Sequence, residues 1–173
     1  MKKLVIVING RGGSGKDTFC EAIGTEWRVI NVSSITPIKE LAALIGWDGC
    51  KDDRGRLLLA RLKEAMTDYN DLPLRYLLDE YKAFLTSDAL VMFVHIREQR
   101  EIERFLDCVK LPSRTLLVRK PEQDCLTYGN SADDLADTFS YDYSYNNTCP
   151  LDEMPADAVR FFRELLAKEG IAE

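Results

Sequence analysis

The stretch LVIVINGRGGSGKDT, residues 4–18, decides the fold. Its first part, LVIVIN (residues 4–9), is a run of mostly β-branched apolar residues and predicts a strand buried on both faces. Its second part, GRGGSGKDT (residues 10–18), has the Gly-x-x-x-x-Gly-Lys spacing of a phosphate-binding P-loop. A helix is predicted to follow from Gly15 to about Trp27. A loop of this spacing between a strand and a helix indicates a nucleotide-binding α/β protein.

The physical chemistry of the loop points to a triphosphate. Glycines at positions 10, 12, 13 and 15 can adopt positive φ, so the backbone N–H groups can turn inward around an anion. The helix beginning at Lys16 adds its positive N-terminal end, and the Lys16 ammonium reaches the β and γ phosphates. The alternative is a glycine-rich turn with a chance lysine. The predicted ATP-binding residues are Gly10, Arg11, Gly12, Gly13, Ser14, Gly15, Lys16, Asp17 and Thr18.

Asp17 stands where most P-loops carry a serine or threonine that helps to hold Mg²⁺. A carboxylate is a hard-oxygen ligand that Mg²⁺ accepts, directly or through water. We therefore predict that Asp17 replaces the hydroxyl as the metal ligand, while Thr18 donates its hydroxyl to a phosphate oxygen. The alternative is that Asp17 only stabilises the N-terminus of the helix electrostatically.

The remaining chain alternates between apolar runs and amphipathic segments. Further strands are predicted at 28–32, 89–96, 114–119 and 141–145, and helices at 37–45, 54–69, 73–85, 98–109, 132–139 and 156–168. This alternation predicts one domain over residues 1–173 with the three-layer P-loop NTPase fold, a parallel sheet with helices on both faces. Within it we predict a helical acceptor-binding insert at about 33–85 and a lid-like segment at about 120–140.

Composition excludes several other classes of protein. A net charge of −6 argues against a nucleic-acid-binding surface, and no apolar run is long enough to cross a membrane. The five cysteines are odd in number and include no Cys-x-x-Cys pair, so neither a disulfide framework nor a zinc site is expected. A reducing cytoplasm fits this cysteine usage best.

Several residues beyond the loop are candidates for the site. Arg97 follows a buried strand, and ligands of open parallel sheets bind at the carboxyl ends of the strands. We expect Arg97 to clamp the transferred or acceptor phosphate, unless it pairs with Glu98 or Glu101. His95, the only histidine, is interpreted as structural rather than catalytic, since phosphoryl transfer to a phosphate needs no histidine. The other candidates are Arg119 for the nucleotide and Ser33, Lys39, Arg54 and Arg61 for the acceptor.

The run GSGKDT resembles the P-loop of bacteriophage deoxynucleoside monophosphate kinases, and animal phosphomevalonate kinases share its Ser-Gly-Lys-Asp portion. TPIKE (residues 36–40) is similar to their Asp-Pro-Leu-Lys-Glu segment, and HIRE (residues 95–98) is similar to a strand that ends in Asp-Val-Arg. Residues 145–147 with 151–153 resemble a late segment near their C-terminal helix. The resemblance implies a P-loop kinase that uses ATP and Mg²⁺ and has a small phosphorylated acceptor as its partner.

Two departures from that family stand out. The strand ending at His95 lacks the aspartate that usually contributes to Mg²⁺ binding, and residues 121–159 contain no lysine or arginine for a lid. The sequence therefore predicts a kinase for a nucleoside monophosphate with Lys16, Asp17 and Arg97 as its catalytic residues. The alternatives are an ATP-binding regulatory or interaction protein with degenerate activity, and a P-loop kinase for another small metabolite.

Overall fold

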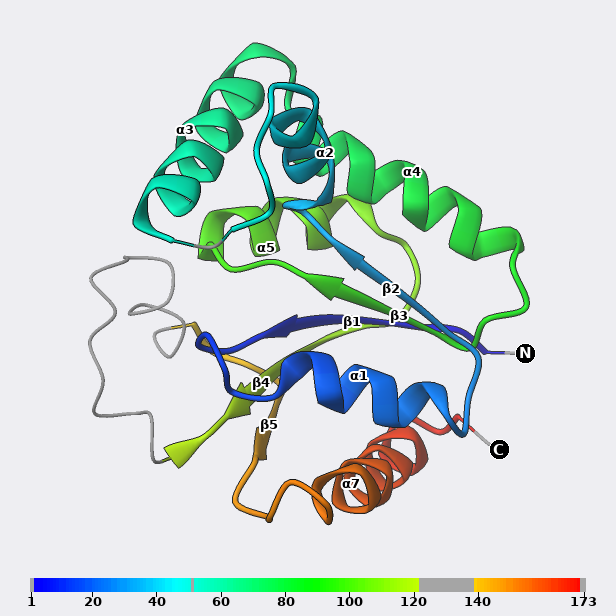
Figure 1. Ribbon diagram of the computed structural model, residues 1–173. Helices are drawn as coiled ribbons and strands as arrows, with labels where there is room; N and C mark the ends of the chain where they lie inside the picture. The colour runs from blue at the N-terminus through cyan, green and yellow to red at the C-terminus, as the bar shows by residue number, and fades with distance from the viewer. Residues whose placement is uncertain (1, 51, 122–138, 172–173) are drawn as a thin grey trace.

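The computed structural model describes residues 2–50, 52–121 and 139–171. Within these ranges the elements follow the predicted alternation (Figure 1). In chain order they are β1 (Leu4–Asn9), α1 (Lys16–Gly24), β2 (Val29–Ser33), α2 (Thr36–Leu44), α3 (Asp53–Asn70), α4 (Leu72–Thr86), β3 (Val91–His95), α5 (Gln99–Cys108), β4 (Ser113–Arg119), β5 (Tyr143–Asn146) and α7 (Met154–Lys168).

The five strands form one parallel sheet in the order β2-β3-β1-β4-β5. β1 lies at its centre and is buried along its whole length, which is why all its residues before Asn9 are apolar. Its two neighbours are β3 and β4. The chain forms β2 and β3 on one side of β1, and then β4 and β5 on the other side. Such a switch point opens a crevice at the carboxyl ends of the strands, where α/β proteins bind ligands.

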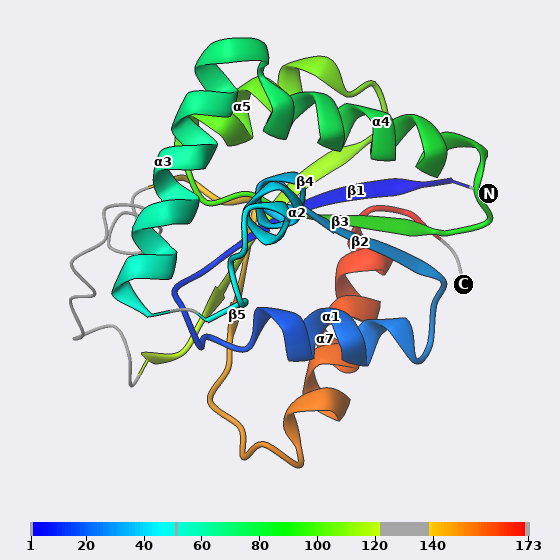
Figure 2. The same cartoon turned by 45° about the horizontal axis from the view of Figure 1, so that its top comes forward.

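Helices cover both faces of the sheet and create two hydrophobic cores (Figures 1 and 2). Alternate residues of a strand point to opposite faces. Ile6 and Ile8 therefore pack with α1 and α7 in one core, whereas Val5 and Val7 pack with α4 and α5 in the other. This arrangement confirms the three-layer α/β fold with a parallel sheet and helices on both faces.

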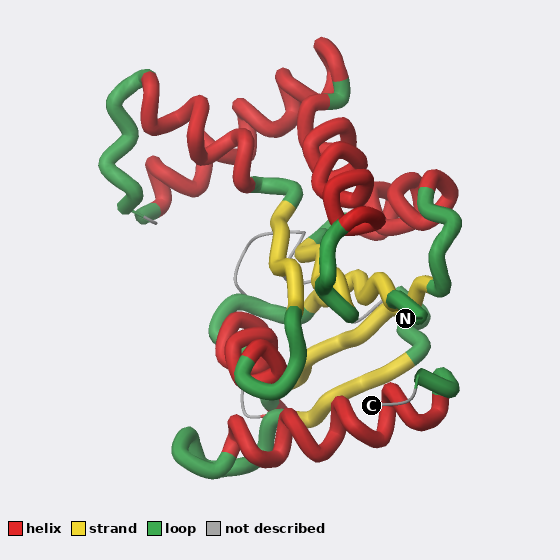
Figure 3. The backbone as a smooth tube through the Cα atoms, turned by 90° about the vertical axis from the view of Figure 1, so that its right-hand side faces the viewer, coloured by secondary structure: helices red, strands yellow, loops and turns green. Residues whose placement is uncertain are grey.

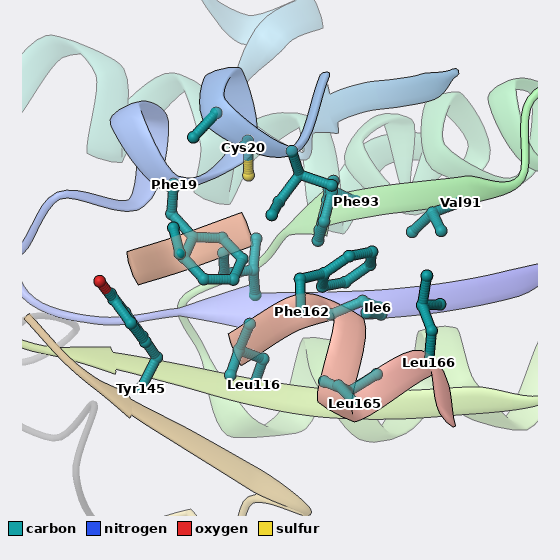
Figure 4. Packing of buried hydrophobic residues seen from close by; sticks show 14 of the residues in the cluster. Ile6, Phe19, Cys20, Val91, Phe93, Leu116, Tyr145, Phe162, Leu165 and Leu166 are labelled. Atoms are coloured by element: carbon teal, nitrogen blue, oxygen red, sulfur yellow. The ribbon is translucent and has the colours of Figure 1, made fainter. Parts of the chain in front are cut away.

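Aromatic rings fill the core beneath α1 and α7 (Figure 4). Phe162 of α7 lies 5.6 Å from Phe93 of β3 and 6.3 Å from Phe19 of α1, measured between ring centroids. Phe19 also contacts Tyr145 of β5 at 5.0 Å. The tilted and edge-on geometries of these contacts are the ones that aromatic pairs prefer. This cluster fixes the helix that follows the glycine-rich loop.

The helices differ from the sequence-based expectation mainly at their ends. α1 ends at Gly24 instead of continuing to about Trp27. Its last turn tightens because the N–H groups of Thr25 and Glu26 donate to carbonyls three residues back, and the Thr25 hydroxyl also donates to the Ala22 carbonyl. α7 starts two residues earlier than expected, at Met154, with Pro155 in its first turn.

The helical region predicted at about 33–85 divides into two parts. Helix α4 packs on the sheet through buried side chains that include Leu77, Tyr81 and Phe84. Helices α2 and α3 extend beyond the sheet as an arm, which we call the α2–α3 arm (Figure 3). The predicted helix at 132–139 and most of the lid-like segment at about 120–140 lie outside the described residues.

Two further expectations can be compared with the described part of the chain. The cysteines at positions 20, 50, 108 and 149 are free thiols there. No helix in the described ranges combines the length and the apolar character required to cross a bilayer.

Candidate nucleotide-binding site

The loop of residues 10–15 follows β1 at the switch point of the sheet. Gly10 has a φ of 147° and lies against β4, where an added Cβ would stand 2.2 Å from the Val118 carbonyl oxygen. Gly15 caps α1 with a φ of 96°, and a Cβ there would stand 2.6 Å from Asn147 Nδ2. Both positions therefore require glycine, for backbone conformation and for space. Gly13 also has positive φ, whereas Gly12 does not, so three of the four loop glycines use this freedom.

Lys16 turns back over the loop from the first position of α1. Its Nζ donates to the carbonyl oxygens of Gly10 at 2.5 Å and Arg11 at 2.8 Å, and it lies 3.5 Å from Ser14 Oγ. The ammonium is thus held inside the curve of the loop, where a bound phosphate would meet it. Together with the N-terminus of α1 it forms a positively charged binding site for an anion.

Asp17 is exposed in the first turn of α1. Its charge acts on His95 at the end of β3 and on Cys20 in the next turn. Burial lowers the pKa of His95 to about 4, Asp17 opposes the shift, and Lys16, Arg97 and Lys39 reinforce it. The imidazole is therefore neutral at pH 7.

His95 is half-buried and is hydrogen-bonded within the sheet. Its Nε2 lies 2.6 Å from Asn31 Oδ1 of β2 and 3.7 Å from Cys20 Sγ of α1. A neutral ring whose Nε2–H donates to Asn31 is anchored between β2 and α1. This geometry agrees with the structural interpretation of His95.

The other predicted residues are distributed around the same end of the sheet. Arg97 lies just after β3 and Arg119 is the last residue of β4, and these two strands flank β1. Ser33 ends β2 beside His95, and Lys39 of α2 is close enough to influence the pKa of that histidine. The charges of Lys16, Asp17, Arg97 and Lys39 thus all act on His95 at the carboxyl end of β3.

Arg54 and Arg61 are exposed on α3, seven residues apart and therefore on one face of that helix. They belong to the α2–α3 arm rather than to the immediate surroundings of the loop. Their assignment to the acceptor remains a prediction.

Two asparagines organise the loop, and the sequence analysis did not single out either. Asn9 is 1% exposed at the end of β1. Its Oδ1 accepts from the Gly10 N–H at 2.8 Å, while its Nδ2 donates to the Arg97 carbonyl at 3.0 Å and to the Tyr141 hydroxyl at 2.8 Å. Asn147 donates from Nδ2 to the Ser14 carbonyl at 3.0 Å and from its backbone N–H to the Arg119 carbonyl at 2.7 Å. Together they attach the loop to β3, β4 and the segment after β5.

The residues present fit a Mg²⁺ ion that comes with the nucleotide. Among the residues that the structure describes, no three side chains of the types His, Cys, Asp and Glu gather as a metal cage. Mg²⁺ on a nucleotide needs no such cage, because it is bound by one or two carboxylates, phosphate oxygens and water. Asp17, exposed beside Lys16, offers one such carboxylate.

Comparison with known proteins shows the fold. No family model and no curated protein matches the sequence. Among solved structures, TT1252 from Thermus thermophilus is 19% identical, with a TM-score of 0.54 over 97% of this chain and 98% of that chain. A candidate kinase from Chloroflexus aurantiacus is 13% identical, with a TM-score of 0.58 over 96% and 97% of the two chains. An unliganded sugar kinase from Janibacter sp. is 14% identical, with a TM-score of 0.51 over 99% and 96%. The chain therefore adopts the three-layer α/β fold of P-loop kinases.

Proposed function

We propose that this protein is an ATP-dependent phosphotransferase that moves the γ-phosphoryl group to a small phosphorylated acceptor, with a nucleoside monophosphate as the preferred class. The observation that carries the proposal is the loop of residues 10–15 at the switch point, with the Lys16 ammonium inside its curve and Asp17 beside it. This arrangement places N–H donors, a positive charge and a carboxylate around one position, as a bound ATP–Mg²⁺ requires.

The residues of the chain act mainly by positioning and by neutralising charge. The N–H groups of the loop hold the β phosphate, and Lys16 exchanges its contacts with the loop carbonyls for the β and γ phosphates. Arg97, at the end of β3, neutralises charge on the group in transfer. Mg²⁺, when bound, adds charge neutralisation at the β and γ phosphates, and Asp17 would hold it.

A phosphorylated acceptor needs neither a general base nor a cationic acid from the residues at this end of the sheet. Its phosphate has a second pKa near 6 and is largely ionised at neutral pH, so the transfer needs no general base. His95 could not serve as a cationic acid at pH 7, because burial lowers its pKa to about 4 and Asn31 engages Nε2. Lys39, Arg54 and Arg61 are the proposed partners of the acceptor phosphate, together with Ser33 at the end of β2.

A second candidate function is an ATP-binding regulatory protein with little transferase activity. It is favoured by the end of β3, where His95 stands in place of the aspartate that such kinases use for Mg²⁺. A kinase for another small metabolite, such as phosphomevalonate or an alcohol, would use the same loop. An alcohol acceptor would require a carboxylate base, for which Asp17 is the available group.

Thermal shift and turnover measurements separate these functions. We expect ATP with Mg²⁺ to raise the melting temperature, a nucleoside monophosphate to raise it further, and ADP to form in a coupled assay only when both are present. Stabilisation by ATP without any acceptor-dependent ADP, across a panel of ribo- and deoxynucleoside monophosphates, would support the regulatory function. Turnover with phosphomevalonate alone would redirect the acceptor assignment.

A further inference from the structure

Helix α3 is attached to the rest of the molecule mainly through half-buried and charged side chains. Of its 18 residues only Gly55 is buried, whereas the shorter α4 buries four residues and α7 buries five. α3 contacts α2 and α4, and its apolar side chains Leu58, Leu62 and Met66 are half-buried rather than buried. Polar contacts therefore help to hold α3 in place.

Two ion-pair contacts join α3 to α5. Lys63, in the middle of α3, donates from Nζ to Glu98 Oε2 at 2.5 Å and to Glu101 Oε2 at 2.8 Å. Asp71, which caps the C-terminus of α3, accepts hydrogen bonds from both terminal guanidinium nitrogens of Arg104 in α5. α3 is thus joined to α5 by ion pairs at its middle and at its end, in addition to its contacts with α2 and α4.

The contact at Lys63 is shielded from water more than an ordinary surface ion pair. The side chains of Lys63 and Glu101 are 15% and 16% exposed, compared with 72% and 70% for the Lys82–Asp79 pair on α4. Lys63 also neutralises two carboxylates that lie against each other. Burial and the neighbouring Glu98 raise the pKa of Glu101 to about 7, and Lys63 opposes that shift. Loss of Lys63 would leave this pair of carboxylates without its cation.

The α5 end of this contact is connected to the nucleotide loop. Glu98 is the N-cap of α5 and follows Arg97 directly in the chain. The Arg97 carbonyl accepts a hydrogen bond from Asn9, whose Oδ1 in turn accepts from the Gly10 N–H. A continuous series of contacts therefore leads from Lys63 on α3 through Glu98 and Arg97 to the loop.

We propose that Lys63 is a positioning residue, which sets the α2–α3 arm at a fixed distance from Arg97 by holding Glu98 and Glu101 at the start of α5. This inference rests on the proposed function, in which Arg97 neutralises charge on the phosphoryl group in transfer. With Lys63 in place, Glu98 and the preceding Arg97 are held in one position, so the Arg97 guanidinium is preorganised for the acceptor. The nucleotide loop has further anchors in Lys16 and Asn147, so we expect ATP binding to depend on the contact much less than acceptor binding does.

The test replaces Lys63→Met, which keeps most of the stem and removes the charge, and uses Lys82→Met as the matched control. We expect Lys63→Met to raise the KM for the acceptor about tenfold, a usual size for coupling between sites, and to leave the KM for ATP within about twofold. Hydrogen exchange should become faster in α3 and at the start of α5. Lys82→Met should change none of these quantities, and Lys63→Arg should recover most of the loss.

A triple variant separates positioning from simple destabilisation. Lys63→Met combined with Glu98→Gln and Glu101→Gln removes the uncompensated carboxylates, so the melting temperature should recover while the acceptor KM stays high. Recovery of both quantities would overturn the proposal, as would an equal rise in both KM values. If the wild type shows no turnover, the proposed function fails, and hydrogen exchange alone then decides: exchange in α3 that is unchanged by Lys63→Met overturns the positioning role.

Discussion

Replacement of Asn9 by alanine should weaken the fold and the nucleotide site together. The Asn9 side chain is 1% exposed and makes three hydrogen bonds, at 2.8, 2.8 and 3.0 Å. Its removal leaves the Gly10 N–H and the Arg97 carbonyl without this partner in a mostly dry region, and each unsatisfied group costs about 1–3 kcal/mol. Allowing for relaxation, we expect a loss of about 3 kcal/mol, which corresponds to a fall of about 6–12 °C in Tm for a protein of this size.

Asn9→Ala should also lower the affinity for ATP, because Asn9 fixes the conformation of Gly10. Without the Asn9 acceptor the first N–H of the loop is no longer held, so we expect ATP affinity to fall about tenfold, or about 1.4 kcal/mol. Urea unfolding gives the stability change, and titration calorimetry with ATP–Mg²⁺ gives the affinity.

Thr115→Val is the matched control for Asn9→Ala. It removes the hydroxyl of another buried polar residue, which bonds Asp142 at 2.8 Å but has no contact with the loop. The control should lose stability and keep ATP affinity. If Asn9→Ala behaves in the same way, Asn9 does not hold the loop and the explanation is wrong.

Three further substitutions test other parts of the account. Gly15→Ala must adopt a φ of 96° and approach Asn147 Nδ2 to 2.6 Å, so it should destabilise the protein by about 2–4 kcal/mol and abolish ATP binding in calorimetry; near-normal binding would refute the assigned loop geometry. Asp17→Ala should raise the Mg²⁺ concentration needed for half-maximal stabilisation by ATP about tenfold, whereas an unchanged Mg²⁺ dependence would leave Asp17 with only its effect on the helix terminus. Burial raises the pKa of Glu101 from 4.5 to about 7, so its contribution to stability is present below pH 4.5 and is lost as the pH rises through 7. Glu101→Gln should therefore flatten the pH dependence of urea unfolding between pH 5 and 8 and be the more stable form at pH 8, by about 1–3 kcal/mol; parallel curves for the two proteins would contradict the raised pKa.

The fold could be predicted because its signals are local. An apolar run such as residues 4–8 is stable only in the middle of a sheet, and the spacing of Gly10, Gly15 and Lys16 identifies the loop and the helix after that strand. The ends of helices were less predictable, because they depend on single hydrogen bonds. The hydrogen bonds of Thr25 and Glu26 to carbonyls three residues back tighten the end of α1 a few residues before the apolar pattern ends.

The supports of the site depend on contacts between residues distant in sequence. Asn147 bonds Ser14 across 133 positions, and no local pattern announces that contact. Asn9 did leave a signal, since it is the one polar residue in a strand buried on both faces and a buried amide must find partners. Lys63 was indistinguishable from the solvated lysines of an amphipathic helix until the fold placed α5 beside it.

The central claim is that the loop and Lys16 serve phosphoryl transfer to a phosphorylated acceptor. Incubation with ATP labelled in the γ phosphate, Mg²⁺ and each nucleoside monophosphate in turn tests it most directly. The account predicts that label appears in the corresponding nucleoside diphosphate, and that Lys16→Ala abolishes both the transfer and ATP binding. If ATP binds tightly but no label leaves it for any acceptor, or if Lys16→Ala binds ATP as well as the wild type does, the claim is contradicted.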